Sequence, residues 1–172
     1  MSMTHYMELL ASNQPWNLII FMAIPVILAE TIAITELYIL FTRNMNSTAK
    51  VISKWAGIIV GIYFLGVFIY LFNNAVIPLT LAGEWRGFAD VIAVGFYLLG
   101  IVPLGGIALL ELGLIKKNAD ENGKLKLHAI FVAIFLVVAH IAMIFGMVNP
   151  DIFMKNTASD SSMNMEMDMS SH

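Results

Sequence analysis

Methionine and histidine side chains concentrate at both ends of the 172-residue chain. The C-terminal set is Met163, Met165, Met167, Met169 and His172, and the N-terminal set is Met3, His5 and Met7. Thioether sulfur is a soft ligand that favours Cu(I) over harder ions such as Zn²⁺. Because cysteine is absent, these residues are the soft ligands available. They predict capture of a copper ion, the alternative being a disordered tail whose methionine bias is accidental.

Two ionisable residues lie near the middle of long apolar stretches. Glu30 is about 16 Å above the inner end of its helix, and His140 lies at a similar depth on the last helix. A charge at this depth is costly, so such residues mostly face a bundle interior and carry function. Met143 and Met147 follow His140 on one helix face. We therefore expect Glu30 and His140 to be neighbours, and these four residues are candidate metal ligands.

A second set of ionisable residues is expected closer to the inner face. Glu36 and Glu111 each lie four or five residues from the inner end of a helix, and His128 lies near the start of another. Shared depth predicts one layer that could relay protons or ions. The structural alternative is that buried Glu–His pairs only lock helix packing, and that Glu111 and His128 extend toward the interface.

Composition identifies the elements that must position these groups. Apolar residues make up 59% of the chain and charged residues 12%, against about 25% charged in soluble domains. Four apolar stretches, residues 16–41, 51–72, 88–115 and 127–148, are each long enough to cross a bilayer, which takes roughly 20 residues. The fold class predicted is an all-α membrane protein, a four-transmembrane-helix bundle in contact with lipid. Kinks are expected at Pro25 and at 103–106.

Charge asymmetry predicts the orientation and the domains. Seven of the nine Lys and Arg residues fall at the 1–2 and 3–4 turns and two on the other side. The positive-inside rule then puts both termini outside. The expected parts are an external segment 1–15, a membrane domain 16–148 and a disordered Met-rich tail 149–172. We expect a bacterial inner (cytoplasmic) membrane, with periplasmic or extracellular termini.

Short repeated patterns bear on the arrangement of the helices. The stretch from Ala33 through Glu36 is similar to that from Ala108 through Glu111, and each follows a proline. Two tandem helical hairpins, or chance similarity between Leu/Ile-rich spans, would explain this. Small residues recur every four positions at Ser53, Gly57 and Gly61, a spacing that favours close helix packing. This face could form a homodimer.

Several function classes are disfavoured. No basic groove or phosphate-binding loop suggests nucleic acid or nucleotide. Membrane cytochromes hold haem between histidines on two helices, whereas His128 and His140 share one predicted helix, which argues against haem. A membrane oxidoreductase ranks lowest among the alternatives, and no catalytic residue is predicted.

The opening NQPWNLIIFMAIPVILAETIAITELYILFTRN, with the four-span layout, resembles small bacterial inner-membrane proteins classed as permeases of unknown function. The resemblance covers residues up to about 150 and implies a transport role without a substrate. The leading hypothesis is therefore Cu(I) binding or transport with external Met-rich capture tails. The alternative is an accessory or assembly subunit of a membrane complex, with structural or proton-relaying buried carboxylates.

The orientation can be tested with reporter fusions. Fusions after Lys50 and Asn118 should report a cytoplasmic location because the basic turns are retained inside. Fusions after Gly83 and Ser171 should report an external one. A cytoplasmic C-terminus would contradict the predicted orientation and remove the external tail on which metal capture depends.

Overall fold

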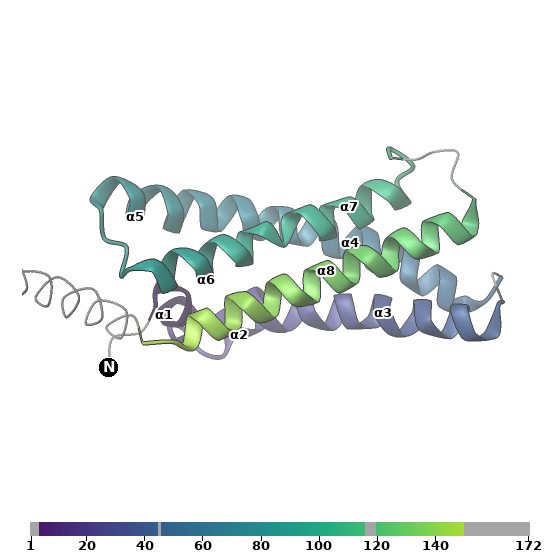
Figure 1. Cartoon of the computed structure of the whole chain (residues 1–172), viewed down its shortest axis with the longest axis horizontal. Coiled ribbons are helices and arrows are strands. Elements are labelled where there is room, and N and C mark those ends of the chain that lie inside the picture. Colours follow the sequence, from purple (N-terminus) through teal and green to yellow (C-terminus); the bar gives the residue numbers. More distant parts are fainter. Residues whose placement is uncertain (1–3, 45, 116–119, 150–172) are drawn as a thin grey trace, which may run out of the picture.

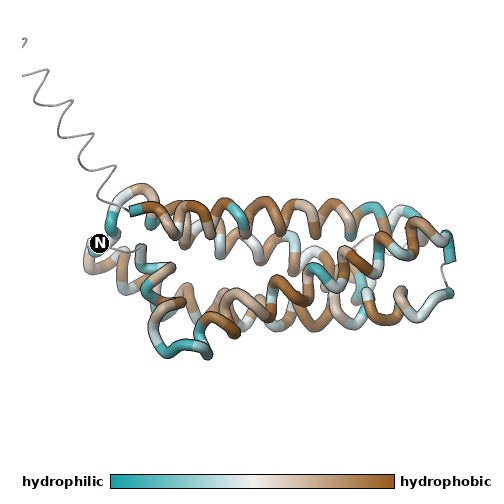
Figure 2. Tube along the Cα trace, turned by 90° about the horizontal axis from the view of Figure 1, so that it is seen from below, coloured by the Kyte–Doolittle hydropathy of each residue, from teal (hydrophilic) through white to brown (hydrophobic). Residues whose placement is uncertain are grey.

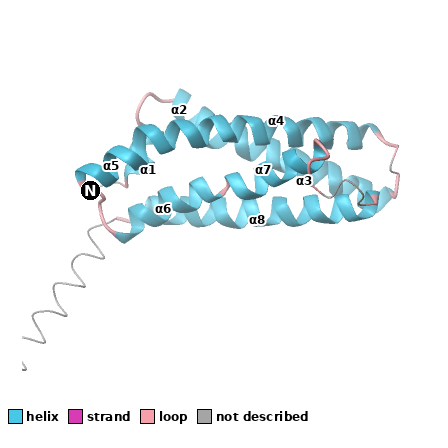
Figure 3. Ribbon diagram, turned by 90° about the horizontal axis from the view of Figure 1, so that it is seen from above, coloured by secondary structure: helices cyan, strands magenta, loops and turns pink. Residues whose placement is uncertain are grey.

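The computed structural model describes residues 4–44, 46–115 and 120–149. Within these ranges every regular element is helical and there is no strand (Figure 3). The elements are α1 (His5–Ala11), α2 (Trp16–Leu18), η1 (Ile19–Ala23), α3 (Ile24–Thr42), α4 (Thr48–Leu71), η2 (Phe72–Val76), α5 (Ile77–Ala82), α6 (Phe88–Leu99), α7 (Ile101–Glu111) and α8 (Glu121–Met147). Here η marks a π-helical turn.

These elements join into four apolar rods long enough to cross a membrane, Trp16–Thr42, Thr48–Ala82, Phe88–Glu111 and Asn122–Met147. The predicted all-α, four-span membrane fold is confirmed. Apolar residues run along the rods and hydrophilic ones gather mainly at the two ends (Figure 2). Both described ends of the chain lie at one end of the bundle, here called the terminal end, and the turns after α3 and α7 lie at the other, the loop end (Figure 1).

The four rods form a closed ring. The first packs on α4, α4 packs on α7, and α8 packs on α6, α7 and α3. Aromatic rings fill the centre, where Phe64 contacts Tyr97 and Phe135. Gly100, at the break between α6 and α7, has no Cβ, so the rings of Phe64 and Phe135 approach its backbone closely.

Prolines explain the irregular turns inside the rods. Pro25 has no N–H, so the carbonyl four residues earlier, Phe21, loses its helical partner. The Tyr97 hydroxyl donates to that carbonyl, and the Tyr63 hydroxyl donates to Ile20 oxygen at 2.9 Å. The π-helical turn η1 ends at Ala23, two residues before Pro25. The irregular backbone is tolerated because each freed group is bonded to protein.

Three predicted boundaries were wrong. The third rod ends at Glu111 rather than at residue 115. The second rod does not end at Phe72 but continues through η2 and α5 to Ala82. Asn73 and Asn74 lie inside this rod, where their side chains donate to the Ile69 and Tyr70 carbonyls at 2.9 and 2.8 Å, which keeps these polar groups within the helix.

The other boundary error is the start of α8, at Glu121 rather than Leu127. Asp120 caps this helix by accepting from the Gly123 N–H at 3.2 Å, as an N-cap aspartate does. In the third rod the expected irregularity occurs at Gly100, three residues before Pro103, while 103–106 remains helical.

The proposed homodimer face is also corrected. Ser53, Gly57 and Gly61 are buried inside the chain. A Cβ on Gly61 would lie 2.3 Å from the Ala108 Cβ, and one on Gly57 would lie 2.7 Å from Ile107. The small residues therefore bring α4 and α7 of the same chain together, and they are not free to bind a second copy.

Gly61→Ala should destabilise the bundle, because the added methyl forces α4 and α7 apart, and overpacking costs about 1–3 kcal/mol. Gly66→Ala on the same helix is the matched control, since a Cβ there meets nothing within 4 Å. Thermal unfolding in detergent should show a lower transition for Gly61→Ala alone. Equal transitions for the two variants would contradict the packing described.

Candidate functional site

Glu36, Glu111 and His128 come together between three rods near the loop end. The Nδ1 atom of His128 on α8 lies 2.5 Å from Glu36 Oε1 on α3. Its other ring nitrogen, Nε2, lies 3.1 Å from Glu111 Oε1 at the end of α7. Residues expected at one depth from the sequence alone are thus in contact, and we call them the triad. Its functional role remains a prediction.

The second rod, which contains α4, completes the support of the triad. Ser53 on α4 donates its hydroxyl hydrogen to Glu36 Oε1 at 3.3 Å. The close approach of α4 and α7 depends on Gly57, whose missing Cβ would lie 3.7 Å from the Glu111 Cγ. The small-residue face therefore brings Ser53 and Glu111 to the same place.

Glu36 and His128 are buried and Glu111 is half-buried, but the triad is not fully paired. Glu36 is 4% exposed and His128 3%. Among the described residues, Glu36 Oε2 and His128 Nε2 have no hydrogen-bond partner. The Nε2–Glu111 distance suits an ion pair, but its direction does not make a hydrogen bond. Buried polar atoms are rarely left without a hydrogen-bond partner, so Glu36 Oε2 and His128 Nε2 are available to bind a further polar group or a proton.

A polar cavity of about 290 Å³ adjoins the triad. Besides the three triad residues and Ser53, its lining includes Lys50, Lys54 and Lys124. Two carboxylates and one histidine carry at most one compensating positive charge, so nearby lysines reduce the cost of keeping both carboxylates ionised. The lysines belong to the loop end, which the sequence predicts to be cytoplasmic.

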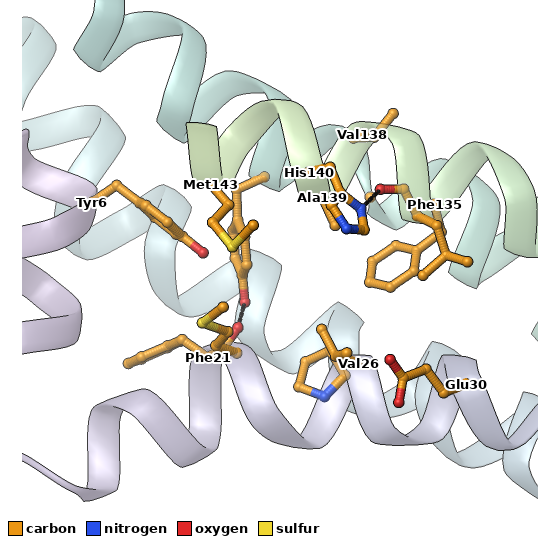
Figure 4. A pocket seen from close by; sticks show the side chains of 14 residues that line it. Tyr6, Phe21, Val26, Glu30, Phe135, Val138, Ala139, His140 and Met143 are labelled. Carbon is orange, nitrogen blue, oxygen red and sulfur yellow. Dashed lines mark hydrogen bonds between the residues drawn. The ribbon is translucent and has the colours of Figure 1, made fainter. Parts of the chain in front are cut away.

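Glu30 and His140 line a different cavity, from opposite walls (Figure 4). The expected direct pair is not formed. The Nδ1 of His140 lies 2.6 Å from the Leu136 carbonyl oxygen, one turn back on α8, and in the described ranges Glu30 has no hydrogen bond or ion pair. Met143 lines the same cavity, whereas Met147 is 62% exposed on the surface.

At the terminal end, α1 docks on the bundle through a carboxylate that is not among the predicted site residues. Asp90 is fully buried and accepts from the His5 backbone N–H at 2.7 Å, and its Oδ2 lies 2.5 Å from the ring Nδ1. The Thr4 hydroxyl donates to the Gly146 carbonyl at 2.6 Å. In the sequence, the only indication of this contact is a single aspartate, Asp90, near the start of an apolar helix.

This docking changes the status of the N-terminal metal residues. His5 uses Nδ1 on Asp90, and half-buried Met7 packs against the core. A metal-binding role for His5 and Met7 remains a prediction. Burial raises the pKa of the neighbouring Tyr6 to about 12, so its hydroxyl stays neutral.

The C-terminal candidates, Met163, Met165, Met167, Met169 and His172, and also Met3, lie outside the described residues. Within the described part of the chain, no group of three or more His, Asp or Glu side chains is arranged to hold a metal ion. The triad is therefore an ion-paired cluster and not a preformed site for a hard cation.

One family model, described as "Family of unknown function (DUF6803)", matches residues 1–163. That description assigns no transport activity, so the resemblance to permeases remains a prediction. No curated protein and no solved structure matches the chain. Because the family match covers far more than half of the 172 residues, the chain belongs to the DUF6803 family.

Proposed function

We propose that this membrane protein relays protons through the triad, by itself or as a subunit of a larger membrane complex. The observation that supports the proposal is the position of His128, whose two ring nitrogens face carboxylates from two other rods. Imidazole can take up a proton at one nitrogen and release one from the other. Glu36 and Glu111 then act as the proton-exchanging groups on its two sides.

Access differs on the two sides of the triad. Glu111 and His128 line the polar cavity with the lysines, where water can exchange protons. Glu36 also lines a groove of about 440 Å³ between α3 and α8, whose far end is Leu136. Leu136 lines the Glu30 cavity as well. Groove and cavity therefore extend from the triad toward mid-membrane.

The distance along this route limits the mechanism. Glu30 lies six residues from Glu36 on one helix, about 9 Å of axial rise. A direct hydrogen bond between the two is therefore excluded, since such bonds span about 3 Å. Water in the groove would have to carry the proton between them. A relay that crosses the membrane would continue from Glu30 through its cavity, which reaches Tyr6 of α1, toward the terminal end.

Glu36→Gln tests the relay, because glutamine keeps the size and can still bond Ser53 and His128, but carries no exchangeable acid. The protein is reconstituted in vesicles with a trapped pH-sensitive dye, and a potassium diffusion potential drives proton entry. Wild-type flux should exceed that of empty vesicles, and Glu36→Gln should return it to the empty-vesicle rate.

Glu84→Gln is the matched control, since Glu84 is exposed at the terminal end and should leave the flux unchanged. The thermal transitions of both variants are measured in parallel. The proposal would be contradicted if a folded Glu36→Gln protein had wild-type flux, or if the wild-type flux were no greater than that of empty vesicles. Either result would mean that the triad only holds the helices together.

A second function, Cu(I) capture by the tail, rests on the sequence. Four alternating methionines and a terminal histidine form a donor set that soft ions prefer. Together with the permease resemblance, this supports a role in copper handling or transport at the inner membrane, with the tail on the external side.

A peptide spanning 159–172 should bind Cu(I) or Ag(I) well ahead of Zn²⁺, because thioethers are soft. Replacing Met163, Met165, Met167 and Met169 with Leu keeps apolar size but removes sulfur. Competition against a chromophoric Cu(I) chelator measures the affinity. Equal Cu(I) affinity of the two peptides would rule out capture by thioether sulfur.

A further inference from the structure

The cavity between the first rod and α8 gathers the mid-membrane heteroatoms. It is a partly open cavity of about 130 Å³, and Glu30, His140, Met22 and Met143 are among its lining residues. Glu30 and His140 are exposed on the protein surface at its mouth. His140 and Met143 are nearly one turn apart on α8, and Glu30 faces them from α3 (Figure 4). The remaining walls are aromatic and aliphatic, including Phe21 and Phe135. One imidazole, two thioethers and one carboxylate thus share a mostly apolar space, in which Tyr6 and Tyr97 are the other polar side chains.

The backbone contact of His140 determines which ring nitrogen is free. A carbonyl oxygen only accepts hydrogen bonds, so the Leu136 carbonyl, 2.6 Å from Nδ1, requires the hydrogen on Nδ1. The neutral ring then carries its lone pair on Nε2. Metal-binding histidines usually donate their other N–H to a carbonyl or carboxylate in this manner. His140 is therefore already in the tautomer that a metal ion needs.

The donors in this cavity suit a particular kind of ion. Thioethers select soft ions such as Cu(I), and imidazole is compatible with them. A hard cation would need more oxygen ligands, and the described residues offer no group of three His, Asp or Glu for it. Methionine side chains have three rotatable bonds, so Met22 and Met143 can adjust to an ion.

The carboxylate adds charge complementarity. Glu30 has no hydrogen bond or ion pair among the described residues, although it lies near the centre of the Trp16–Thr42 rod. An ionised carboxylate at this depth is costly when unpaired. A monovalent cation held by the facing side chains would compensate it without requiring direct Glu30–His140 contact.

We propose that His140, Met143 and Met22 form an intramembrane site for a soft monovalent metal ion, Cu(I) or Ag(I), with Glu30 balancing its charge. The site uses the same ion as the proposed tail but different residues, and it does not depend on the triad. Tyr6 of α1 is 5% exposed and also lines the cavity, so α1 covers its terminal side. The ion would pass beside α1 or enter between α3 and α8.

The experiment uses the full chain with Met163, Met165, Met167 and Met169 changed to Leu, which removes the sulfur of the tail. In this background Met143→Leu is compared with Met147→Leu, the same change on an exposed residue of the same helix that does not line the cavity. Met-to-Leu exchange preserves volume and usually costs less than about 1.5 kcal/mol, so both proteins should fold. Anaerobic competition against a chromophoric chelator gives Cu(I) stoichiometry and affinity.

The full chain with the four tail methionines changed to Leu should bind one Cu(I), with X-ray absorption showing both sulfur and nitrogen neighbours. Met143→Leu should weaken binding about tenfold or more, since even outer contacts of metal sites change affinity 10–100-fold, and Met147→Leu should not. His140→Phe should remove the nitrogen signal. The proposal is overturned if the full chain with the four tail methionines changed to Leu binds no Cu(I), or if Met143→Leu and Met147→Leu bind Cu(I) equally.

Discussion

The structure depends on one constraint, that polar groups inside the membrane must find partners within the protein, because lipid offers none. His128 meets this constraint by joining carboxylates from the first and third rods to the fourth, and Ser53 adds the second rod. A single buried histidine therefore connects all four spans. Removing the histidine would leave two carboxylates without their shared partner, and breaking a buried ion pair in this way typically costs about 3–5 kcal/mol.

The same constraint explains the shape of the half of the bundle nearest the terminal end. Pro25 frees the Phe21 carbonyl, to which the Tyr97 hydroxyl of the third rod donates. The Tyr63 hydroxyl of the second rod donates to the adjacent Ile20 carbonyl in the π-helical turn. The backbone irregularity thus fixes where the tyrosines lie. Because Tyr97 and Phe21 also line the Glu30 cavity, the π-helical turn and the cavity are parts of one arrangement. Pro25 therefore shapes the space into which Glu30 and His140 face.

The features predicted from sequence were those fixed by helix geometry. Hydropathy located the four rods, and axial rise placed Glu36, Glu111 and His128 at one depth. The sequence does not determine how each helix is rotated about its axis or which helix it packs against. The spacing of Ser53, Gly57 and Gly61 correctly indicated close packing, but nothing in that spacing distinguishes a helix of the same chain from one of a second copy. Likewise, depth alone put Glu30 beside His140, although His140 finds a nearer acceptor in its own backbone. The docking of α1 depends on Asp90, whose buried position follows only from the folded bundle.

The triad and the Glu30 cavity differ in depth but lie along the same seam between α3 and α8, with Leu136 between them. A cation beside Glu30 would lie roughly 9 Å along the helix from Glu36. At an effective dielectric constant of about 20, two unit charges at that separation interact by about 2 kcal/mol. This is within the usual range of coupling between two binding sites, about 1–3 kcal/mol. An ion in the cavity and a proton on the triad would therefore oppose each other measurably without any contact, and the separation of the two sites is compatible with exchange of one charge for the other.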